Sequence, residues 1–454
     1  MRILHYFLGF PPYRSGGLTK FATDLMCSQI DLGHQVFALW PGTMNFFHSN
    51  ISLKKNKPYC NIENYEIINP LPVPLDEGIR DFNSYTKSCD KNVFKSFFQN
   101  HKIDVIHVHT LMGLYQEFVF VAKELGIPLI FTTHDYFGIC PKVTLFRQNK
   151  PCFDPKCVNC FDCNKNALSI KKIKIIQSSL YRKLKDFKIV AIFRKRHRNS
   201  FFQECLNISS EEKKNKIYAI QYRELRAFYI EMLKQFDFIH FNSSVTESIY
   251  QRYFAPRCSK IISITHRNIG DNRTCALNKK ESSILRMTYL GPLNSLKGFY
   301  LLRDVLDELW KDGLKSFSLK IFHHMENRPP YIQEQKEGYR YSDLKEIFSE
   351  TDILLAPSLC YETFGYTVLE ALCYGVPVIV SDNVGAKDIV ENCGLVVKAG
   401  DRESLKNAIL SLNANKIEEL TRNIFSSKKT KLWDNFAKEM NSIYNRFIDN
   451  TSVL

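Results

Sequence analysis

The strongest chemical signal in this sequence is a pair of glutamates, Glu362 and Glu370, around the start of a predicted helix. A strand is predicted to end near Pro357, and the helix to cover residues 364–374. The first turn of a helix has unpaired N–H groups and partial positive charge, so it binds phosphate readily. Glu370 could accept both hydroxyls of a ribose diol, and Glu362 could reach the hydroxyls of an attached sugar. The segment predicts a site for a sugar linked to a nucleoside diphosphate; two solvated surface glutamates are the alternative.

Alternating strands and helices are predicted to position this segment. Each apolar run that predicts a strand is followed by a stretch with helical spacing, and several of these stretches end at a glycine. The predicted strands cover residues 2–8, 35–40, 104–109, 128–133, 236–243, 285–290, 317–322, 352–356, 376–380 and 394–397. Short connections between alternating strands and helices are typical of α/β proteins with parallel sheets.

A polar stretch over residues 268–283 divides the chain in two. We place a domain boundary there, which gives a first domain over 1–267 and a second over 284–430. Residues 431–454 form a separate terminal helix with an apolar face. Ligands of such sheets bind beyond the carboxyl ends of the strands, and the spaces between domains are frequent binding sites. We therefore expect the ligand in a cleft between the two domains.

The segment 352–394 resembles the donor site of the family-4 retaining glycosyltransferases, which have the GT-B fold. Seven residues separate Glu362 from Glu370, as in that family's pattern. The resemblance is moderate over 1–40 and 104–136 and weak elsewhere. It implies two Rossmann-like domains facing a cleft, with the nucleotide-sugar donor bound mainly by the C-terminal domain and the acceptor mainly by the N-terminal domain. It also implies that no metal is required and that the terminal helix packs back on the N-terminal domain.

The resemblance further implies roles for single residues. The residues implied to bind the donor are Gly16, Gly17, Lys297, Phe364, Gly365, Tyr366, Thr367 and Glu370. Those implied to act in catalysis are His134, Lys297 and Glu362. Lys297 would neutralise charge on the leaving diphosphate, and Glu362 would orient the sugar rather than attack it. His134, at the carboxyl end of a predicted strand, would face the donor sugar and the acceptor.

The activity implied is transfer of a sugar from a UDP-, GDP- or ADP-sugar, with retention, to a hydroxyl of a saccharide or lipid-linked saccharide. The pathway implied is assembly of surface polysaccharide or lipopolysaccharide. The alternative is a catalytically silent relative that binds sugar nucleotides within an assembly complex. Pro292 supports that alternative, because it stands where the family has an arginine. The retained Glu362, Glu370 and Lys297 oppose it.

Two histidines, His107 and His109, alternate along one predicted strand and therefore point to the same face. We expect them to line the cleft. A metal pair is less favoured, because no third ligand is evident nearby in the sequence.

Five of the 14 cysteines lie in a loop over residues 140–163. They are Cys140, Cys152, Cys157, Cys160 and Cys163. The spacing from Cys157 to Cys163 is tight enough for a thiolate metal site. A structural zinc held by four of the five is the favoured interpretation, while an iron–sulfur cluster and idle or redox-active thiols remain open.

A basic helical insert is predicted over residues 165–235, and its segment 171–198 has eleven lysines and arginines against one acid. Apolar side chains alternate with these charges, which favours contact with an anionic membrane surface, although a solvated helical face is the alternative. The whole chain is basic, with a net charge of +15. We expect no nucleic-acid partner, because neither an aromatic RNA-binding signature nor a recognition helix is present.

The first residues, 1–8, are too short an apolar run for a signal peptide, and no stretch reaches about 18 uncharged apolar residues. We therefore expect a cytoplasmic protein, with peripheral contact to the inner face of the membrane through 171–198.

Overall fold

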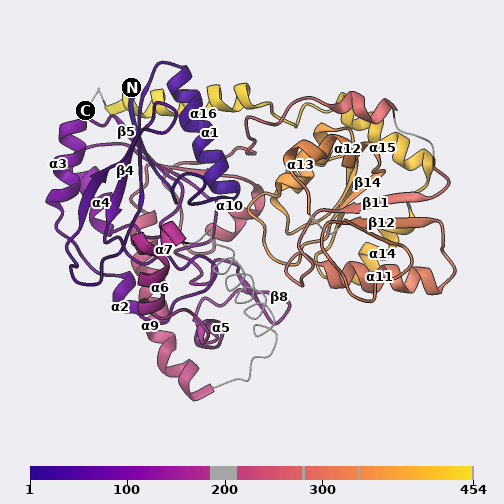
Figure 1. Cartoon of the computed structure of the whole chain (residues 1–454), viewed down its shortest axis with the longest axis horizontal. Coiled ribbons are helices and arrows are strands. Elements are labelled where there is room, and N and C mark those ends of the chain that lie inside the picture. Colours follow the sequence, from indigo (N-terminus) through magenta and orange to yellow (C-terminus); the bar gives the residue numbers. More distant parts are fainter. Residues whose placement is uncertain (185–211, 279–281, 336–337, 452–454) are drawn as a thin grey trace.

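A computed structural model of the chain describes residues 1–184, 212–278, 282–335 and 338–451. Figure 1 shows two α/β domains side by side, each built around its own sheet, with the terminal helix running along one edge. The fold is therefore α/β with two Rossmann-like domains, as the sequence predicts.

The first domain contains an eight-stranded sheet in the order β10-β9-β6-β5-β1-β2-β4-β3. Its strands are β1 (Arg2–Tyr6), β2 (Gln35–Pro41), β3 (Ser52–Lys55), β4 (Glu63–Ile68), β5 (Val105–Val108), β6 (Leu129–Thr132), β9 (Phe238–Phe241) and β10 (Ser259–Ile261). Only the exposed edge strand β3 runs antiparallel to its neighbour. The central strands β1, β5, β6 and β9 are almost completely buried, which explains why their sequences read as continuous apolar runs.

Helices cover both faces of this sheet. They are α1 (Gly17–Asp31), α2 (Phe82–Tyr85), α3 (Asn92–His101), α4 (Gln116–Glu124) and α10 (Ser244–Tyr250). A further set belongs to the region between β6 and β9: the two-residue strands β7 (Phe146–Arg147) and β8 (Lys150–Pro151), then α5 (Cys160–Asn164), α6 (Ile170–Ile176), α7 (Ser179–Leu184) and α9 (Glu212–Leu233). The part of the basic segment over 185–198 lies outside the described residues.

The second domain has a six-stranded, fully parallel sheet in the order β13-β12-β11-β14-β15-β16. Its strands are β11 (Leu285–Tyr289), β12 (Phe317–Ile321), β13 (Ile332–Glu334), β14 (Ile353–Ala356), β15 (Val378–Ser381) and β16 (Gly394–Val397). Its helices are α11 (Phe299–Lys311), α12 (Leu344–Ser349), α13 (Tyr366–Cys373), α14 (Arg402–Leu410) and α15 (Ala414–Ser426), with short 3₁₀ turns over 273–278, 341–343 and 385–389. The parallel order brings the loops after β11 and β14 to the same edge of the sheet.

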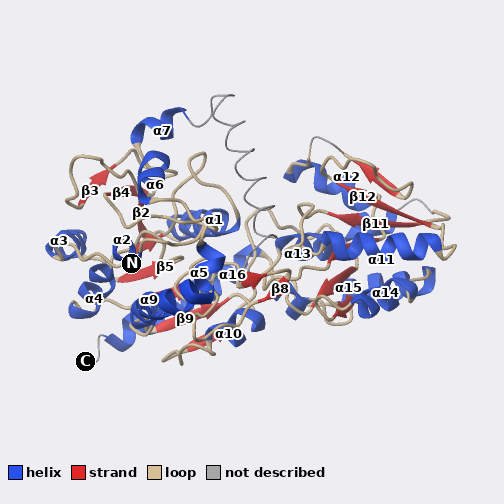
Figure 2. Cartoon of the chain, turned by 90° about the horizontal axis from the view of Figure 1, so that it is seen from below, coloured by secondary structure: helices blue, strands red, loops and turns tan. Residues whose placement is uncertain are grey.

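The terminal helix α16 (Trp433–Thr451) lies against the first domain (Figure 2). Its indole Nε1 at Trp433 donates to Ser28 Oγ of α1 at 2.6 Å, and His34 and Asn441 are bonded at 2.8 Å. The side chains of Phe436, Met440, Ile443 and Tyr444 are buried. An apolar face with a few buried polar contacts therefore holds α16 on the domain that begins the chain.

The two domains contact each other through the loop that follows β9. Ser243 Oγ donates to the Thr363 carbonyl oxygen at 2.8 Å, and Ser244 Oγ donates to Asp388 at 2.6 Å. A Cβ atom at Gly385 would overlap Ser243, so glycine permits this close approach. Among the described helices, none is both long and apolar enough to span a membrane.

Candidate functional site

An ion pair between Lys297 and Glu362 lies at the centre of the candidate site. Lys297 precedes α11 and Glu362 precedes α13, and their Nζ and Oε2 atoms are 2.8 Å apart. The side chains retain 33% and 17% exposure, so both remain open to a ligand. The pairing of β11 with β14 brings these two turns together although they are far apart in the sequence. A cation for phosphate and a carboxylate for hydroxyls therefore stand side by side.

The backbone around Lys297 is held firmly. Its N–H donates to Asn294 Oδ1 at 3.0 Å, and the hydroxyl of Tyr289 lies 2.9 Å from the carbonyl oxygen of Pro292. Burial opposes the charge on Lys297, but the nearby Glu362 carboxylate outweighs it and raises the pKa of the lysine. Lys297 is therefore protonated at neutral pH.

The carboxylate of Glu362 is fixed from two sides. Its Oε1 atom accepts a hydrogen bond from Ser358 Oγ, while Oε2 contacts Lys297. Its own N–H donates to the Asn383 carbonyl at 2.9 Å, and the Gly385 N–H donates to the Glu362 carbonyl at 3.1 Å. Ser358 is a site residue that the sequence analysis missed, although it lies inside the segment that carried the prediction.

The start of α13 lies directly after Glu362. Phe364 is buried in the core of the second domain, whereas Tyr366 and Thr367 in the first turn are partly exposed. Gly365 caps the helix with φ of 110°, a conformation that favours glycine. Because the first-turn N–H groups point out of a helix start, this end of α13 suits an anion beside Lys297.

A contact between the domains joins Gly17 to Tyr366. A Cβ atom at Gly17 would stand 3.0 Å from the Tyr366 ring, so only a glycine lets the ring approach the start of α1 so closely. Gly16 caps α1 with φ of 115° and is exposed. The structure thus brings Gly16 and Gly17 of the first domain to the same region as Tyr366 of the second.

Glu370 lies deeper than the other predicted residues. It is 8% exposed, and its Oε1 atom is 3.6 Å from Nε2 of His266. The His266 ring packs edge-on against Tyr366 and Tyr341, at 5.2 and 5.3 Å between ring centroids. His266 lies in the segment that connects the two domains and was not predicted from the sequence.

His134 follows β6 and lies near the second domain, because Thr363 Oγ1 donates to its carbonyl oxygen at 3.3 Å. Its ring packs on Phe21 at 4.7 Å between centroids. The residue keeps some exposure, yet burial of the ring lowers its pKa to about 3. Burial also raises the pKa of the adjacent Asp135 to about 6, although Thr110 and the Phe137 N–H both donate to that carboxylate.

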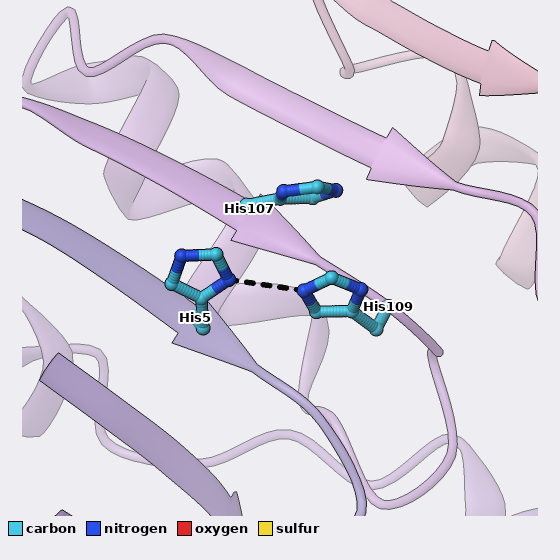
Figure 3. Close-up of side chains that lie close together, drawn as sticks. All are labelled: His5, His107 and His109. Carbon is cyan, nitrogen blue, oxygen red and sulfur yellow. Dashed lines mark hydrogen bonds between the residues drawn. The ribbon is translucent and has the colours of Figure 1, made fainter. Parts of the chain in front are cut away.

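The expectation that His107 and His109 line the cleft was wrong. Both side chains are completely buried, so neither lines a cleft. A third potential ligand does exist: His5 lies on the neighbouring strand, in register with His107. One nitrogen of each ring lies within 4.8 Å of the others (Figure 3). The sequence concealed this group because His5 is about a hundred residues away.

The five cysteines of the loop over 140–163 are not gathered as a group of metal ligands in this conformation, and the zinc site stays a prediction. In the described parts of the chain, the only group of three or more potential ligands within 4.8 Å is the histidine group, so no three of these thiols come that close. The loop instead surrounds Arg226 of α9, which donates to the carbonyl oxygens of Ile139, Asp154 and Pro155 at 2.9 to 3.1 Å. A buried guanidinium bonded to three carbonyls therefore helps to hold the loop.

Comparison with known proteins identifies both domains. The family model "Glycosyltransferase Family 4" matches residues 15–151, and "Glycosyl transferases group 1" matches residues 285–415. Together they cover more than half of the chain. Sucrose-phosphate synthase 4 of Arabidopsis thaliana is 41% identical over 66 residues, which are 14% of this chain and 6% of that protein. The chain thus matches only a small part of the length of this curated relative.

Two solved structures share the fold over almost the whole chain. An α,α-trehalose-phosphate synthase from Burkholderia xenovorans, in complex with glucose-6-phosphate, has a TM-score of 0.57 at 11% identity, covering 98% of this chain and 100% of that one. Anabaena Alr3699/HepE in complex with UDP has a TM-score of 0.52 at 14% identity, with 100% of both chains covered. At these identities the likeness concerns the fold.

Proposed function

Because this chain belongs to the family-4 glycosyltransferases with the GT-B fold, we propose that it transfers a sugar from a nucleotide-diphosphate sugar to an acceptor hydroxyl. The observation that carries the proposal is the Lys297–Glu362 pair at 2.8 Å, set before the starts of α11 and α13. The ammonium group and the first turn of α13 would receive the diphosphate, and Glu362 would accept hydroxyls of the sugar.

The reaction proposed is transfer with retention at the anomeric carbon. The bond from C1 to the leaving phosphate oxygen breaks with oxocarbenium character, and the acceptor oxygen bonds to C1 on the same face. Lys297 and the first-turn amides of α13 would stabilise the charge left on the diphosphate, so no metal is required. Glu362 would orient the sugar, and His134 would contact a sugar hydroxyl across the domain boundary.

The donor proposed is a UDP-, GDP- or ADP-sugar. The UDP bound by the Anabaena neighbour supports this class. Glu370 would accept the ribose hydroxyls, but its side chain is only 10% exposed and lies beside Tyr366 and Tyr341. Ribose binding would therefore require at least one of these aromatic rings to move.

The acceptor proposed is a saccharide or a lipid-linked saccharide of surface polysaccharide or lipopolysaccharide assembly. A phosphorylated monosaccharide is the second candidate, because the Burkholderia neighbour binds glucose-6-phosphate. A basic chain with a net charge of +15 suits either a phosphorylated sugar or a pyrophosphate-linked lipid.

Release of nucleoside diphosphate tests the proposed activity. Purified protein would be incubated with UDP-glucose, GDP-mannose and ADP-glucose, with and without acceptor mixtures. Turnover that is lost in Lys297→Ala and kept in Lys345→Ala, an exposed lysine on α12, would support the proposal. Binding of a sugar nucleotide without turnover of any donor would instead favour a catalytically silent partner, for which the proline at residue 292 is the main argument.

We also propose that segment 171–198 contacts an anionic membrane surface. In its described part, Ile175 on α6 and Leu180 on α7 are 52% and 65% exposed, and α6 also contains Lys171, Lys172 and Lys174. The double variant Lys171→Glu with Lys172→Glu should release the protein from phosphatidylglycerol vesicles, because it reverses charge beside the exposed apolar side chains. Lys311→Glu with Lys345→Glu is the matched control in the second domain; equal binding by both variants would contradict the proposal.

A further inference from the structure

Five histidines of the first domain belong to two hydrogen-bonded groups inside the protein, which meet at Gln29 and Tyr444. They are His5 on β1, His107 and His109 at the end of β5, His134 after β6 and His240 on β9. Three other side chains complete the set, namely Gln29 of α1, Thr132 of β6 and Tyr444 of α16. All of these residues are buried except His134, which is partly exposed. The only member near the candidate site is thus His134.

Each of the five rings is neutral at physiological pH. Burial lowers the pKa of His5 and His240 to about 4 and that of His134 to about 3. It also lowers the pKa of His107 and His109, and the neighbouring histidines lower both further. A neutral imidazole has one N–H and one bare nitrogen, so in a chain of hydrogen bonds it donates at one nitrogen and accepts at the other. The direction of the hydrogen bond at one end of such a group therefore fixes the direction of every hydrogen bond in it.

The carbonyl oxygen of Ile262 fixes the direction of the hydrogen bonds in the first group. It lies 2.7 Å from His240 Nε2 and can only accept, so Nε2 has the proton. His240 Nδ1 then accepts from the Thr132 hydroxyl at 3.0 Å, and Thr132 Oγ1 accepts from His107 Nε2 at 2.7 Å. His107 Nδ1 is left bare, and it accepts from the Tyr444 hydroxyl at 2.5 Å. The single phenolic proton is thereby directed at His107.

Gln29 links the direction of the hydrogen bonds in the first group to that in the second group, which begins at His5. The Nε2 atom of Gln29 makes no hydrogen bond of full geometry. Gln29 nevertheless lies close enough to the Tyr444 hydroxyl to lower the pKa of that phenol, against the larger rise that burial causes. The Tyr444 hydroxyl donates its only proton in the hydrogen bond to His107, so toward Gln29 its oxygen can only accept. The amide nitrogen therefore faces Tyr444, and the amide oxygen faces His5.

The second group of hydrogen bonds ends at His134. Gln29 Oε1 lies 2.7 Å from His5 Nε2, which must donate to it. His5 Nδ1 then accepts from His109 Nε2 at 3.0 Å, the bond drawn in Figure 3. His109 Nδ1 in turn accepts from His134 Nε2 at 3.3 Å. His134 keeps a bare Nδ1, to which no residue in the described parts of the chain donates.

We propose that Gln29 and Tyr444 are positioning residues that hold His134 as the tautomer with its proton on Nε2, leaving Nδ1 bare to accept a hydrogen bond from a sugar hydroxyl. The opposite tautomer would present an N–H there and could not accept. Since Tyr444 belongs to α16, docking of the terminal helix determines the state of a residue at the site. The catalytic consequence rests on the proposed function, whereas the tautomer itself does not.

A metal ion at His5, His107 and His109 is the competing explanation for this cluster. Every ring nitrogen of the three already has a hydrogen-bond partner, in Gln29, His134, Thr132, Tyr444 or one another. An ion would have to break at least two of these bonds. The hydrogen-bonded chain therefore accounts for the group without an ion.

Nitrogen NMR of the imidazole rings tests the proposal in the full-length protein. Protein labelled with ¹⁵N-histidine is compared with His134→Gln, whose missing signals identify His134. We expect a protonated Nε2 and an unprotonated Nδ1. In Gln29→Met, of similar size, His5 loses its acceptor and turns its proton toward His109. The His134 signals should then change to those of the Nδ1–H tautomer.

Tyr444→Phe is the second variant, because it removes only the hydroxyl between Gln29 and His107. The amide of Gln29 is then free to turn over, and we expect both tautomers of His134. Tyr6→Phe is the matched control: Tyr6 is buried on the same strand as His5, and its hydroxyl donates to the Met112 carbonyl at 2.7 Å. It should leave the His134 signals unchanged.

The outcomes separate this inference from the proposed function. Unchanged His134 signals in both Gln29→Met and Tyr444→Phe would overturn it, as would one equivalent of bound zinc that is lost in His107→Ala. A changed tautomer with kcat/KM for sugar transfer reduced about tenfold or more would support both. A changed tautomer with unchanged kcat/KM would support the hydrogen-bonded chain and refute the role of His134 in transfer.

Discussion

Gly298 touches the backbone of Pro357 so closely that any side chain at residue 298 would overlap the Pro357 carbonyl oxygen. The backbone at Gly298 has φ of 73°, which an L side chain rarely adopts. Because Lys297 precedes this glycine and Glu362 follows Pro357 on its loop, the contact sets the distance between the two charged groups. It turns two separate helix starts into one site.

Gly298→Ala should therefore destabilise the protein and separate the ion pair. We expect a loss of more than about 3 kcal/mol in the free energy of unfolding, since backbone strain and steric overlap add. Gly313→Ala is the control, because Gly313 has φ of 99° but open space around it, and it should cost only about 1–2 kcal/mol. Urea unfolding of both variants measures the difference, and equal losses would show that the contact with Pro357 has no effect.

Lys297→Ala should lower kcat more than it raises the KM for the donor. The lysine is protonated beside Glu362, and charge on the leaving diphosphate grows only as the bond breaks. Loss of such a contact costs about a hundredfold or more in kcat. Initial rates over a range of donor concentrations separate the two parameters. A variant in which KM rises and kcat is kept would show that Lys297 contributes to binding alone.

Acid should weaken the fold through the buried histidines. In the unfolded chain a histidine binds its proton below about pH 6.5, whereas folded His240 does so only near pH 4. Between these values the unfolded state binds more protons, so the free energy of unfolding falls as the pH falls. For His240 alone the loss is about 3 kcal/mol. His240→Gln should flatten the curve of unfolding free energy between pH 6.5 and 4; an unchanged slope would contradict this.

Asp135 should change the stability of the fold with pH in the opposite direction to the histidines. Burial raises its folded pKa to about 6 from the ordinary value of 3.8, so the folded state binds the extra proton between these values. Stability from this group is full below pH 3.8 and is lost as the pH rises to about 6. Asp135→Asn should therefore gain stability relative to the parent as the pH rises through this window. Thermal unfolding at pH 4 and pH 7 measures the sign, and a gain confined to pH 4 would refute it.

The regular framework was predictable from the sequence. Every strand predicted from an apolar run is present, because the central strands of a parallel sheet are buried on both faces. The strands that were missed are short or lie near the sheet edges, such as β3 with its exposed lysines and β13 with three residues. Such segments have too little buried surface to leave a pattern.

The candidate site was predictable only where its residues are close in sequence. Glu362 and the start of α13 share one segment, so their relation could be read directly. The partners His266 and His5 depend on strand order and register, which periodicity does not specify. Ser358 is only four residues before Glu362, but its spacing alone does not show that its hydroxyl turns toward the carboxylate. For the same reason, the spacing of the cysteines gave no sign that Arg226 on α9 bonds to the carbonyl groups of their loop.

Glu370→Gln tests whether the buried carboxylate binds the ribose. Glutamine keeps the volume but loses the charge and one acceptor, so affinity for the nucleoside diphosphate should fall about tenfold. Glu346→Gln, on the exposed surface of α12, is the control and should bind as the parent does. The sharper measurement titrates both proteins with the nucleotide that binds best and with its 2′-deoxy form. The parent should lose affinity for the deoxy nucleotide, whereas Glu370→Gln should lose little more, because the contact is already gone. Equal further losses in both proteins would place the ribose elsewhere and leave Glu370 as a structural partner of His266.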